Sequence, residues 1–405
     1  MEPPVPILIL DNTSTFGGAT KSLSYLLRAL DRERFKPILV TGQSKEFLTE
    51  HFDCTWYHYT PKLPWVHNLI YRKIVSFKLF RFRVLKKTLH ILRFMYWIIF
   101  ITVPEAFTYA RLGRKHSVAV VHLNNILGSQ LAGILAAKLL RVPCVAHLRD
   151  FEEVHPITRF YARLIDHHVA ISGAIRDNLL ELGVPDTRIT VVHDALDLAD
   201  FQSTERDTRV KKEFGLTAGQ ATFGIFGRIV EWKGIREFIL AAREVFEDVP
   251  DARAFVVGDH SGVDGAFFRS MQQLVADLGL NEKITFTGYR DDVPDVMAEM
   301  AIIVHASTRP EPFGMVIIEG MAMKKPVIAS NGGGPLDIIV NGETGLLVES
   351  GDATAMGHAI STLLRHHDLR RNMGLAGFER VSRLFTSHRY ASQMAVIYQH
   401  LGATA

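Results

Sequence analysis

Short apolar runs alternate with amphipathic helical patterns along this chain, and that alternation restricts the possible folds more than any other feature. In the first half, apolar runs occur at residues 5–10, 38–41, 118–123, 142–148, 169–171 and 189–193. Helical patterns follow at residues 23–30, at 127–140 and up to residue 182. Continuous apolar strands separated by helices indicate a parallel sheet that is covered on both faces. The first half therefore predicts a doubly wound α/β domain.

The same alternation starts again after a polar stretch at residues 196–214, which is typical of a connection between domains. Strands are then expected at residues 222–226, 254–257, 284–286, 302–305, 327–329 and 346–348. At 405 residues, the chain is long enough for two cores of roughly 200 residues each. We predict two doubly wound α/β domains, residues 1–200 and 201–385, and a C-terminal helix at 386–405 that packs back toward the first domain.

Composition excludes a disordered or fibrous protein and leaves an enzyme possible, because almost half of the residues are apolar and under a quarter are charged. The two cysteines, Cys54 and Cys144, lie in apolar stretches, so we expect reduced, buried thiols. The first residues include an acid and prolines but no basic n-region, so no secretion signal is expected and a cytoplasmic location is favoured.

Loops that directly follow strands are where such sheets bind ligands. After the first strand, Gly17 and Gly18 precede a helix whose free backbone N–H groups could meet a phosphate or a carboxylate. The loop is not a P-loop, because Thr20 stands where that motif has glycine before Lys21 and Ser22, and it is not G-x-G-x-x-G either. A tight turn that needs glycine is the alternative interpretation.

The first strand of the second half is followed by two cations. Gly227 and Arg228 stand at the strand end, and Lys233 opens the next helix. Two cations at the carboxyl edge of a sheet suit a diphosphate. Ordinary surface charges are the alternative.

The segment from Glu311 to Glu319 carries the strongest signal, because its two glutamates lie on either side of an expected helix start near Phe313. Free N–H groups there could bind an anion, and Gly314 allows a close approach of the backbone. A carboxylate just before the helix could accept hydrogen bonds from sugar hydroxyls. Glu319 lies in an otherwise apolar stretch, where a carboxylate needs a partner such as a ribose diol. In the alternative interpretation, Glu311 only caps the helix.

The spacing of these two glutamates resembles the E-x7-E motif of the retaining GT-B glycosyltransferases, and the second domain is similar to glycosyltransferase family 4. The similarity covers nearly all of residues 220–350. The other segments that match the family, in order, are residues 227–228, 233–234, 286–297, 326–329, 332–333 and 342–348. The resemblance implies the GT-B fold, with two Rossmann-like domains facing across a cleft, the first for the acceptor and the second for the nucleotide-sugar donor.

The resemblance also implies roles for individual residues. Arg228 and Lys233 would neutralise the donor diphosphate as negative charge develops on the leaving nucleotide. Glu311 would hold the donor sugar, and Glu319 the ribose. The implied catalytic residues are Glu311, Arg228, Lys233 and His147. The implied donor-binding residues are Gly17, Gly18, Gly227, Arg290, Phe313, Gly314, Met315 and Glu319.

Two of these assignments, Arg290 and His147, come from other loops. The loop at Tyr289 and Arg290 resembles the wall that receives the nucleobase. His147 follows a first-domain strand at the place where such enzymes often carry a histidine beside the reacting sugar. A buried histidine with a structural role is the alternative there, and Arg149 and Asp150 are competing candidates in the same loop.

The sequence contains no D-x-D triplet and no His/Cys cluster with the spacing of metal ligands. We therefore expect Arg228, Lys233 and a helix N-terminus to stabilise the leaving diphosphate without a divalent ion. This agrees with the metal-independent chemistry that the resemblance implies. No cofactor is expected beyond the donor itself, a UDP- or GDP-sugar.

A basic apolar insertion is expected at about residues 62–103. No acidic residue occurs between Asp53 and Glu105, and aromatic and aliphatic residues are mixed with nine cations in that interval. This composition is typical of helices in an anionic membrane surface, and the most apolar part, residues 94–103, is too short to span a bilayer. A pair of core helices with basic outer faces is the alternative. Nucleic-acid binding is not expected, because no recognition motif accompanies the charge.

Together these features predict a retaining glycosyltransferase that moves a sugar from a nucleoside diphosphate to an acceptor hydroxyl. The expected acceptor is a glycan or a lipid-linked precursor of a cell-envelope polysaccharide, and the expected location is the inner face of the membrane. A sugar-nucleotide epimerase of the same architecture and a non-catalytic, membrane-associated partner protein are the alternatives.

Overall fold

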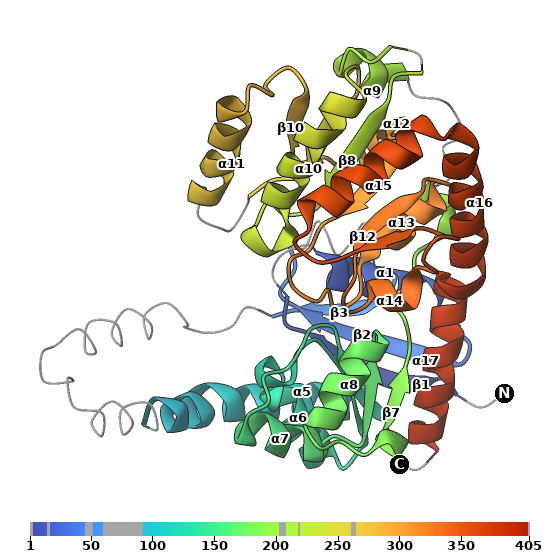
Figure 1. The fold of residues 1–405 in the computed structure, drawn as a ribbon. Helices are drawn as coiled ribbons and strands as arrows, with labels where there is room; N and C mark the ends of the chain where they lie inside the picture. Colours follow the sequence, from blue (N-terminus) through green and yellow to red (C-terminus); the bar gives the residue numbers. More distant parts are fainter. Residues whose placement is uncertain are drawn as a thin grey trace, which may run out of the picture. The chain divides into compact units, whose positions relative to one another are not determined.

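Figure 1 shows the computed structural model, which describes residues 3–13, 17–44, 52–59, 92–201, 208–217, 219–260 and 265–403. The chain forms two compact units. Unit 1 comprises Met1–Ala170, Ile175–Val192 and Ala391–Ala405, and unit 2 comprises Ile171–Ala174 and His193–Tyr390. The division at residues 192–193 lies next to the polar stretch from which the sequence predicts a boundary near residue 200.

Unit 1 contains a seven-stranded parallel sheet in the order β3-β2-β1-β4-β5-β6-β7. Its strands are β1 Val5–Asp11, β2 Phe35–Thr41, β3 Thr55–His58, β4 Val120–Asn124, β5 Cys144–Leu148, β6 His167–Ala170 and β7 Ile189–Val191. Ile7 to Leu10 are consecutive and fully buried, which requires cover on both faces of the sheet. Burial on both faces explains why the strands are continuous apolar runs in the sequence.

Helices connect the strands of unit 1. They are α1 Gly18–Ala29, α5 Val103–Lys115, α6 Leu131–Leu140, α7 Pro156–Arg163, α8 Gly173–Glu181 and the later part of α17 Ser387–Gly402. Before α6, the expected helix at residues 127–140 begins with a separate 3-10 turn, Leu127–Ser129. β3 is the strand that the sequence does not predict, because its four residues are only partly buried at the sheet edge and form no apolar run.

Unit 2 contains a six-stranded parallel sheet in the order β10-β9-β8-β11-β12-β13. Its strands are β8 Thr222–Phe226, β9 Arg253–Val257, β10 Ile284–Gly288, β11 Ile302–His305, β12 Val327–Ser330 and β13 Leu346–Val348. All six agree with the expected positions to within two residues at either end. The strand order reverses between β8 and β11, so the loops after these two strands diverge at a topological switch point.

The helices of unit 2 are α9 Thr208–Glu213, α10 Ile235–Asp248, α11 Ala266–Asp277, α12 Val293–Glu299, α13 Met315–Ala322, α14 Pro335–Ile338, α15 Ala353–Arg365 and α16 His367–Leu384. Figure 1 shows α10 and α15 side by side, and their apolar faces enter the buried core of the unit together with β8, β9 and β11. α9 lies in the stretch expected to be a linker, where Val210 is fully buried.

Of the basic insertion expected at about residues 62–103, residues 62–91 lie outside the described part of the chain. The described part is helical from Leu92 to Trp97, continues as a π-helix over Ile98–Thr102 and then becomes α5. Among the described residues, no helix is both long and apolar enough to cross a membrane. Cys144 is buried and Cys54 partly buried, and both are free thiols.

Candidate functional site

The carboxyl ends of β8 and β11 bring the two strongest sequence motifs of unit 2 together. β8 and β11 are hydrogen-bonded neighbours in the parallel sheet, with Ile302 opposite Phe223. The loop after β8 leads into the 3-10 turn Glu231–Lys233, and the loop after β11 leads to Glu311. Because parallel strands end at the same edge, residues 78 positions apart in the sequence meet there.

Three side chains converge on one oxygen of Glu311. Its Oε2 accepts hydrogen bonds from Lys233 Nζ at 2.7 Å, from Ser307 Oγ at 2.8 Å and from His305 Nε2 at 3.1 Å. Glu311 is only 8% exposed. Among the described residues, none donates a hydrogen bond to the second oxygen, Oε1. That oxygen is the one left to accept from a hydroxyl of a ligand.

The surroundings of Glu311 keep its carboxylate charged. Burial alone would raise the pKa of Glu311, because desolvation disfavours the anion. The hydrogen bond from His305 and the charge of Lys233 outweigh this effect and hold the pKa well below its ordinary value. Lys233 also lies over the ring of Trp232, with Nζ 4.2 Å from the ring centroid, in a cation–π contact. The site therefore presents a fixed anion beside a fixed cation.

Glycine at position 234 makes the approach of these two loops possible. Gly234 has φ 72°, and a Cβ there would lie 1.8 Å from the carbonyl oxygen of Ala306, directly after β11. The Thr308 N–H group also donates to the carbonyl oxygen of Trp232 at 2.8 Å. Lys233 is consequently held against the loop that carries Glu311.

A second group of glycines fixes the backbone of Glu311 itself. The Gly334 N–H group donates to the Glu311 carbonyl oxygen at 2.8 Å. A Cβ at Gly333, where φ is 76°, would lie 2.1 Å from that same oxygen, and a Cβ at Gly334 would lie 2.2 Å from the Phe313 carbonyl oxygen. The glycine run that the sequence places after β12 is thus required by a close approach of two backbones.

The helix expected near Phe313 begins at Met315, and Gly314 is its N-cap with φ 110°. Among the described residues, none accepts a hydrogen bond from the N–H groups of Phe313, Gly314 or Met315. Their contact with the sugar or phosphate of a donor stays a prediction. Glu319 is buried in the second turn of α13. Its contact with a ribose stays a prediction.

Arg228 lies on the exposed side of the same edge. The preceding residue, Gly227, donates its N–H to Val257 at 2.9 Å, and Gly258 donates to Gly288 at 3.0 Å, so the ends of β8, β9 and β10 are tied together. A Cβ at Gly258 would lie 2.0 Å from the carbonyl oxygen of Gly227. The position of Arg228 is thus fixed by its backbone, while its contact with a diphosphate stays a prediction.

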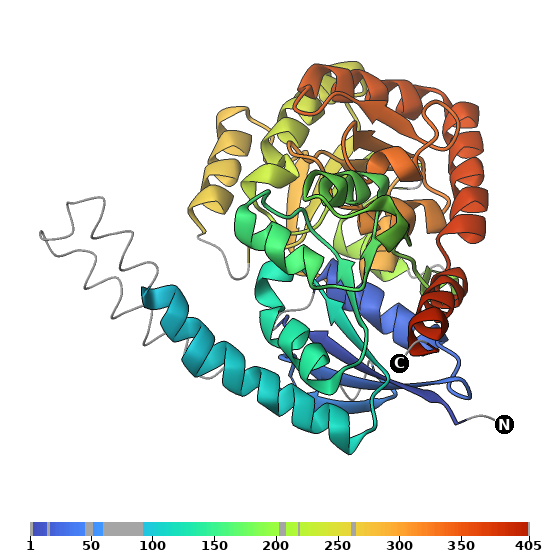
Figure 2. The same ribbon diagram turned by 90° about the horizontal axis from the view of Figure 1, so that it is seen from below.

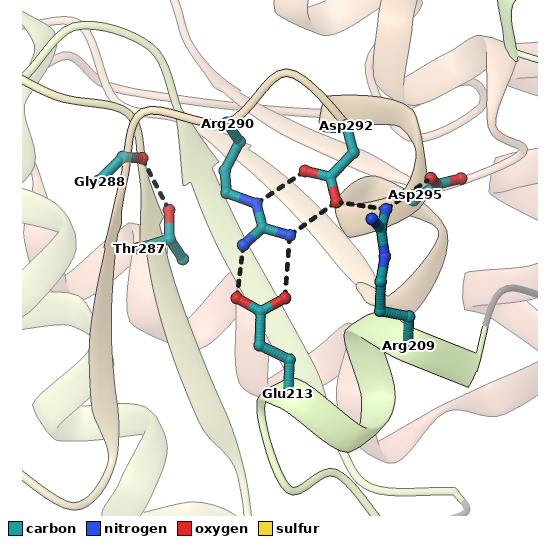
Figure 3. Close-up of polar contacts among 7 residues, drawn as sticks. All are labelled: Arg209, Glu213, Thr287, Gly288, Arg290, Asp292 and Asp295. Atoms are coloured by element: carbon teal, nitrogen blue, oxygen red, sulfur yellow. Dashed lines mark hydrogen bonds and ion pairs between the residues drawn. The ribbon is translucent and has the colours of Figure 1, made fainter.

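Arg290, expected to face the nucleobase, is engaged by two carboxylates (Figure 3). Its Nε and Nη2 donate to Asp292 at 2.7 and 2.6 Å, and Nη1 and Nη2 donate to Glu213. The hydrogen bonds that Arg290 donates to these carboxylates raise the pKa of its guanidinium above the ordinary value. Since Glu213 belongs to α9, the guanidinium fastens α9 to the loop after β10. Tyr289 in that loop is 70% exposed and open to a ligand.

Unit 1 places His147 inside its core. The imidazole is fully buried and stacks on His122, with ring centroids 5.5 Å apart. Burial, followed by the charge of Arg149, lowers the pKa of His147 well below its ordinary value, so the ring is neutral. Arg149 is itself buried and donates to Asn124 Oδ1 at 2.7 Å, whereas Asp150 is exposed. Both interpretations of His147, the structural one and the contact with a sugar, stay predictions.

Gly17 does not form the tight turn weighed as an alternative for the glycine loop. Its φ is −161°, an extended conformation open to any residue, and a Cβ there would meet nothing within 4 Å. Gly17 instead precedes α1, which begins at Gly18. Gly17 is therefore not required by backbone strain, and the space beside its backbone is open. Residues 14–16 of the same loop lie outside the described part.

Sequence reasoning missed two residues that complete the Glu311 site, His305 and Ser307. Their position in the sequence could have identified them. His305 is the last residue of β11 and Ser307 follows shortly after it, at the carboxyl edge of the sheet where ligands bind. Within the described ranges, no group of three or more His, Cys, Asp or Glu residues has an arrangement that could hold a metal ion.

Comparisons with known proteins agree with this architecture. The family model "Glycosyl transferases group 1" matches residues 207–380, and "Glycosyltransferase Family 4" matches residues 16–200. N-acetyl-α-D-glucosaminyl L-malate synthase of Bacillus anthracis is 26% identical over 71% of this chain and 76% of its own length. The lipopolysaccharide core mannosyltransferase LpcC of Rhizobium leguminosarum is 30% identical over 66% of this chain and 75% of its own length.

Two solved structures share the fold over nearly the whole chain. A glycosyltransferase from Rickettsia africae has a TM-score of 0.82 at 21% identity and covers 100% of both chains. Anabaena HepE, solved with UDP and glucose, has a TM-score of 0.79 at 21% identity and covers 98% of this chain and 99% of its own. The two doubly wound units thus define the GT-B class of glycosyltransferases. The two family models together span most of the sequence, and the chain belongs to glycosyltransferase family 4.

The glycine clamp on Glu311 can be tested with two neighbouring, identical substitutions. Gly334 has φ −57°, which alanine tolerates, so Gly334→Ala acts only through its 2.2 Å clash with Phe313. We expect it to destabilise the protein by about 2–3 kcal/mol and to weaken UDP binding at least tenfold. Gly332→Ala is the control, because its Cβ would meet nothing closer than 3.8 Å. Thermal unfolding and titration calorimetry with UDP would measure both effects, and equal behaviour of the two variants would contradict the clamp.

The role of Arg290 as a fastening residue predicts a penalty for Arg290→Lys, since an ammonium group cannot reproduce the forked hydrogen bonds to Glu213 and Asp292. We expect a loss of about 1–2 kcal/mol in the free energy of unfolding. Arg209→Lys is the matched control, because Arg209 is 62% exposed and pairs with the same Asp292. That variant should stay within about 0.5 kcal/mol of the wild type. Urea unfolding would compare them, and a stable Arg290→Lys protein would argue against the fastening role.

Proposed function

We propose that this glycosyltransferase uses a nucleoside-diphosphate sugar, transfers the sugar to an acceptor hydroxyl with retention at the anomeric carbon, and needs no metal ion. The observation that carries the proposal is the Glu311 carboxylate, which uses Oε2 for three protein donors while Oε1 faces no protein donor among the described residues. A sugar hydroxyl is the natural donor to this second oxygen.

The neighbouring groups suit the diphosphate of the same donor. Lys233 lies 2.7 Å from Glu311, and the N–H groups of Phe313, Gly314 and Met315 lie at the start of the adjoining helix. In the proposed reaction, the bond between the anomeric carbon and the diphosphate oxygen breaks, and its electron pair stays on the leaving nucleotide. Lys233, Arg228 and the helix start would stabilise that charge, which removes the need for a divalent ion.

UDP is the nucleotide with which we propose to test the site, and a GDP-sugar is the competing donor. Anabaena HepE was solved with UDP-glucose, which supports a UDP-sugar through the shared fold. The Glu213–Arg290–Asp292 network holds the loop at Tyr289, and this loop is the proposed wall for the base.

The proposed acceptor is a glycan or a lipid-linked precursor in cell-envelope polysaccharide synthesis. Relatives include a lipopolysaccharide core mannosyltransferase and the capsular polysaccharide glycosyltransferase CapM of Staphylococcus aureus, which supports this class of acceptor. A lipid-linked acceptor would also require the enzyme to work at a membrane surface, which we propose to be the anionic inner face of the membrane.

The donor site is tested by the variants Lys233→Ala and Glu311→Gln. Loss of a charge-assisted hydrogen bond costs about 1.5–3 kcal/mol, so Lys233→Ala should weaken UDP binding by at least tenfold. Glu311→Gln should leave UDP affinity within about threefold and instead reduce turnover of the UDP-sugar at least a hundredfold. Calorimetry with UDP and release of labelled sugar from UDP-glucose would measure the two effects.

The matched control is Lys211→Ala, which removes another ion-paired lysine of unit 2, 3.4 Å from Glu299 and in the helix α9. It should bind UDP like the wild type. Wild-type affinity in Lys233→Ala would exclude the proposed diphosphate site. The stereochemistry is tested separately. Retention would be refuted if the coupling constant of the anomeric proton in the NMR spectrum showed that the product has the opposite anomeric configuration to the donor.

A further inference from the structure

The helix that precedes α5 exposes apolar side chains on every side. Leu92 is 57% exposed and Phe100 63% exposed, and Phe94, Met95, Tyr96 and Ile99 are also exposed. Consecutive residues of an α-helix point about 100° apart, so three exposed neighbours, residues 94–96, already cover most of the circumference. Arg93 is the one charged residue between positions 92 and 103. A helix that is apolar all round normally has an apolar environment on all sides.

The same helix is packed normally in its second half. In α5, Ala106, Tyr109 and Ala110 are buried, and a Cβ at Gly113 would lie 2.4 Å from Leu140 Cδ1 of α6. Thr102, at the end of the π-helix, is the first buried residue. Figure 1 and Figure 2 show that the cyan helix, which includes α5, extends away from the other elements of unit 1. Unit 1 therefore holds the apolar part firmly by one end.

The length of the exposed apolar helix and the charge of the preceding sequence both suit an anionic bilayer. Eleven residues, 92–102, rise roughly 16 Å as a helix, which is about half of the 30 Å hydrocarbon core of a bilayer. Nine lysines and arginines and no acid lie between Asp53 and Arg93, counting Arg93 itself. Cations next to an apolar helix complement anionic headgroups.

We propose that residues 92–101 insert into one leaflet of an anionic membrane and anchor unit 1 there. This goes further than adsorption to the surface, because a helix that lies in the headgroup plane needs a polar face toward water and this one has none. Pairing of two copies through the same helices is the competing arrangement. The inference deepens the membrane part of the proposed function and rests on it, but it does not depend on the chemistry of the donor site.

Vesicle flotation of the full chain tests the anchor. The probes are vesicles of phosphatidylcholine alone and of phosphatidylcholine with 30% phosphatidylglycerol, floated before and after a wash in about 1 M NaCl. We expect binding to the anionic vesicles that resists the wash. Ile99→Ser with Phe100→Ser should lower the bound fraction at least tenfold. Val396→Ser is the matched control, since this apolar residue of α17 is 66% exposed, and it should bind like the wild type.

Depth is measured with brominated phosphatidylcholines, which quench tryptophan fluorescence only within the acyl chains. Trp97 should be quenched, and Trp97→Phe should lose most of that quenching.

Three results would overturn insertion. They are release of the wild type from the vesicles by salt, absence of quenching at Trp97, and concentration-dependent dimers that the double serine variant abolishes. UDP affinity of the double variant should equal that of the wild type. If the anchor alone is wrong, the wild type binds UDP but does not stay on the anionic vesicles after the salt wash. If the donor site alone is wrong, the wild type stays on the vesicles and Lys233→Ala binds UDP like the wild type.

Discussion

The buried carboxylate of Glu311 is the constraint on which the candidate site depends. An anion that is only 8% exposed is costly unless cations and hydrogen-bond donors surround it. Lys233, His305 and Ser307 supply them, all at the same oxygen. This concentration of donors fixes the orientation of the carboxylate and leaves its other oxygen for a ligand. The charge that we propose to bind the donor sugar is thus stabilised before any ligand arrives, which is what preorganisation means physically.

The backbone around Glu311 shows how the edge of a parallel sheet can position a buried carboxylate. Side chains would separate the loops that follow β8, β11 and β12, and glycines at 234, 333 and 334 remove that obstacle with contacts near 2 Å to a hypothetical Cβ. Parallel strands provide the common edge, and the glycines provide the close approach. The site is therefore a consequence of the doubly wound topology combined with three positions where no side chain fits.

The sequence predicts the parts of this protein that follow from local pattern. All six strands of unit 2 are predicted, and the four central strands, β8, β9, β11 and β12, form continuous apolar runs because they are buried on both faces. The spacing of the two glutamates provides the resemblance to the family. β3 is missed because a partly exposed edge strand lacks such a run. His305 and Ser307 are missed because their role arises only when the loop folds back onto Glu311. Arg290 itself is predicted, as part of the loop beside the nucleobase, but its two carboxylate partners, one of them in α9, cannot be inferred from spacing.

The central claim is that the edge formed by β8, β11 and the start of α13 binds the nucleotide end of the donor. Hydrogen–deuterium exchange of the full chain with and without UDP tests it most directly, because the N–H groups of Phe313, Gly314 and Met315 donate to no described residue. We expect UDP to slow exchange in peptides that cover residues 313–316 and 227–233. Unchanged exchange in both segments at saturating UDP, with protection elsewhere in the chain, would contradict it.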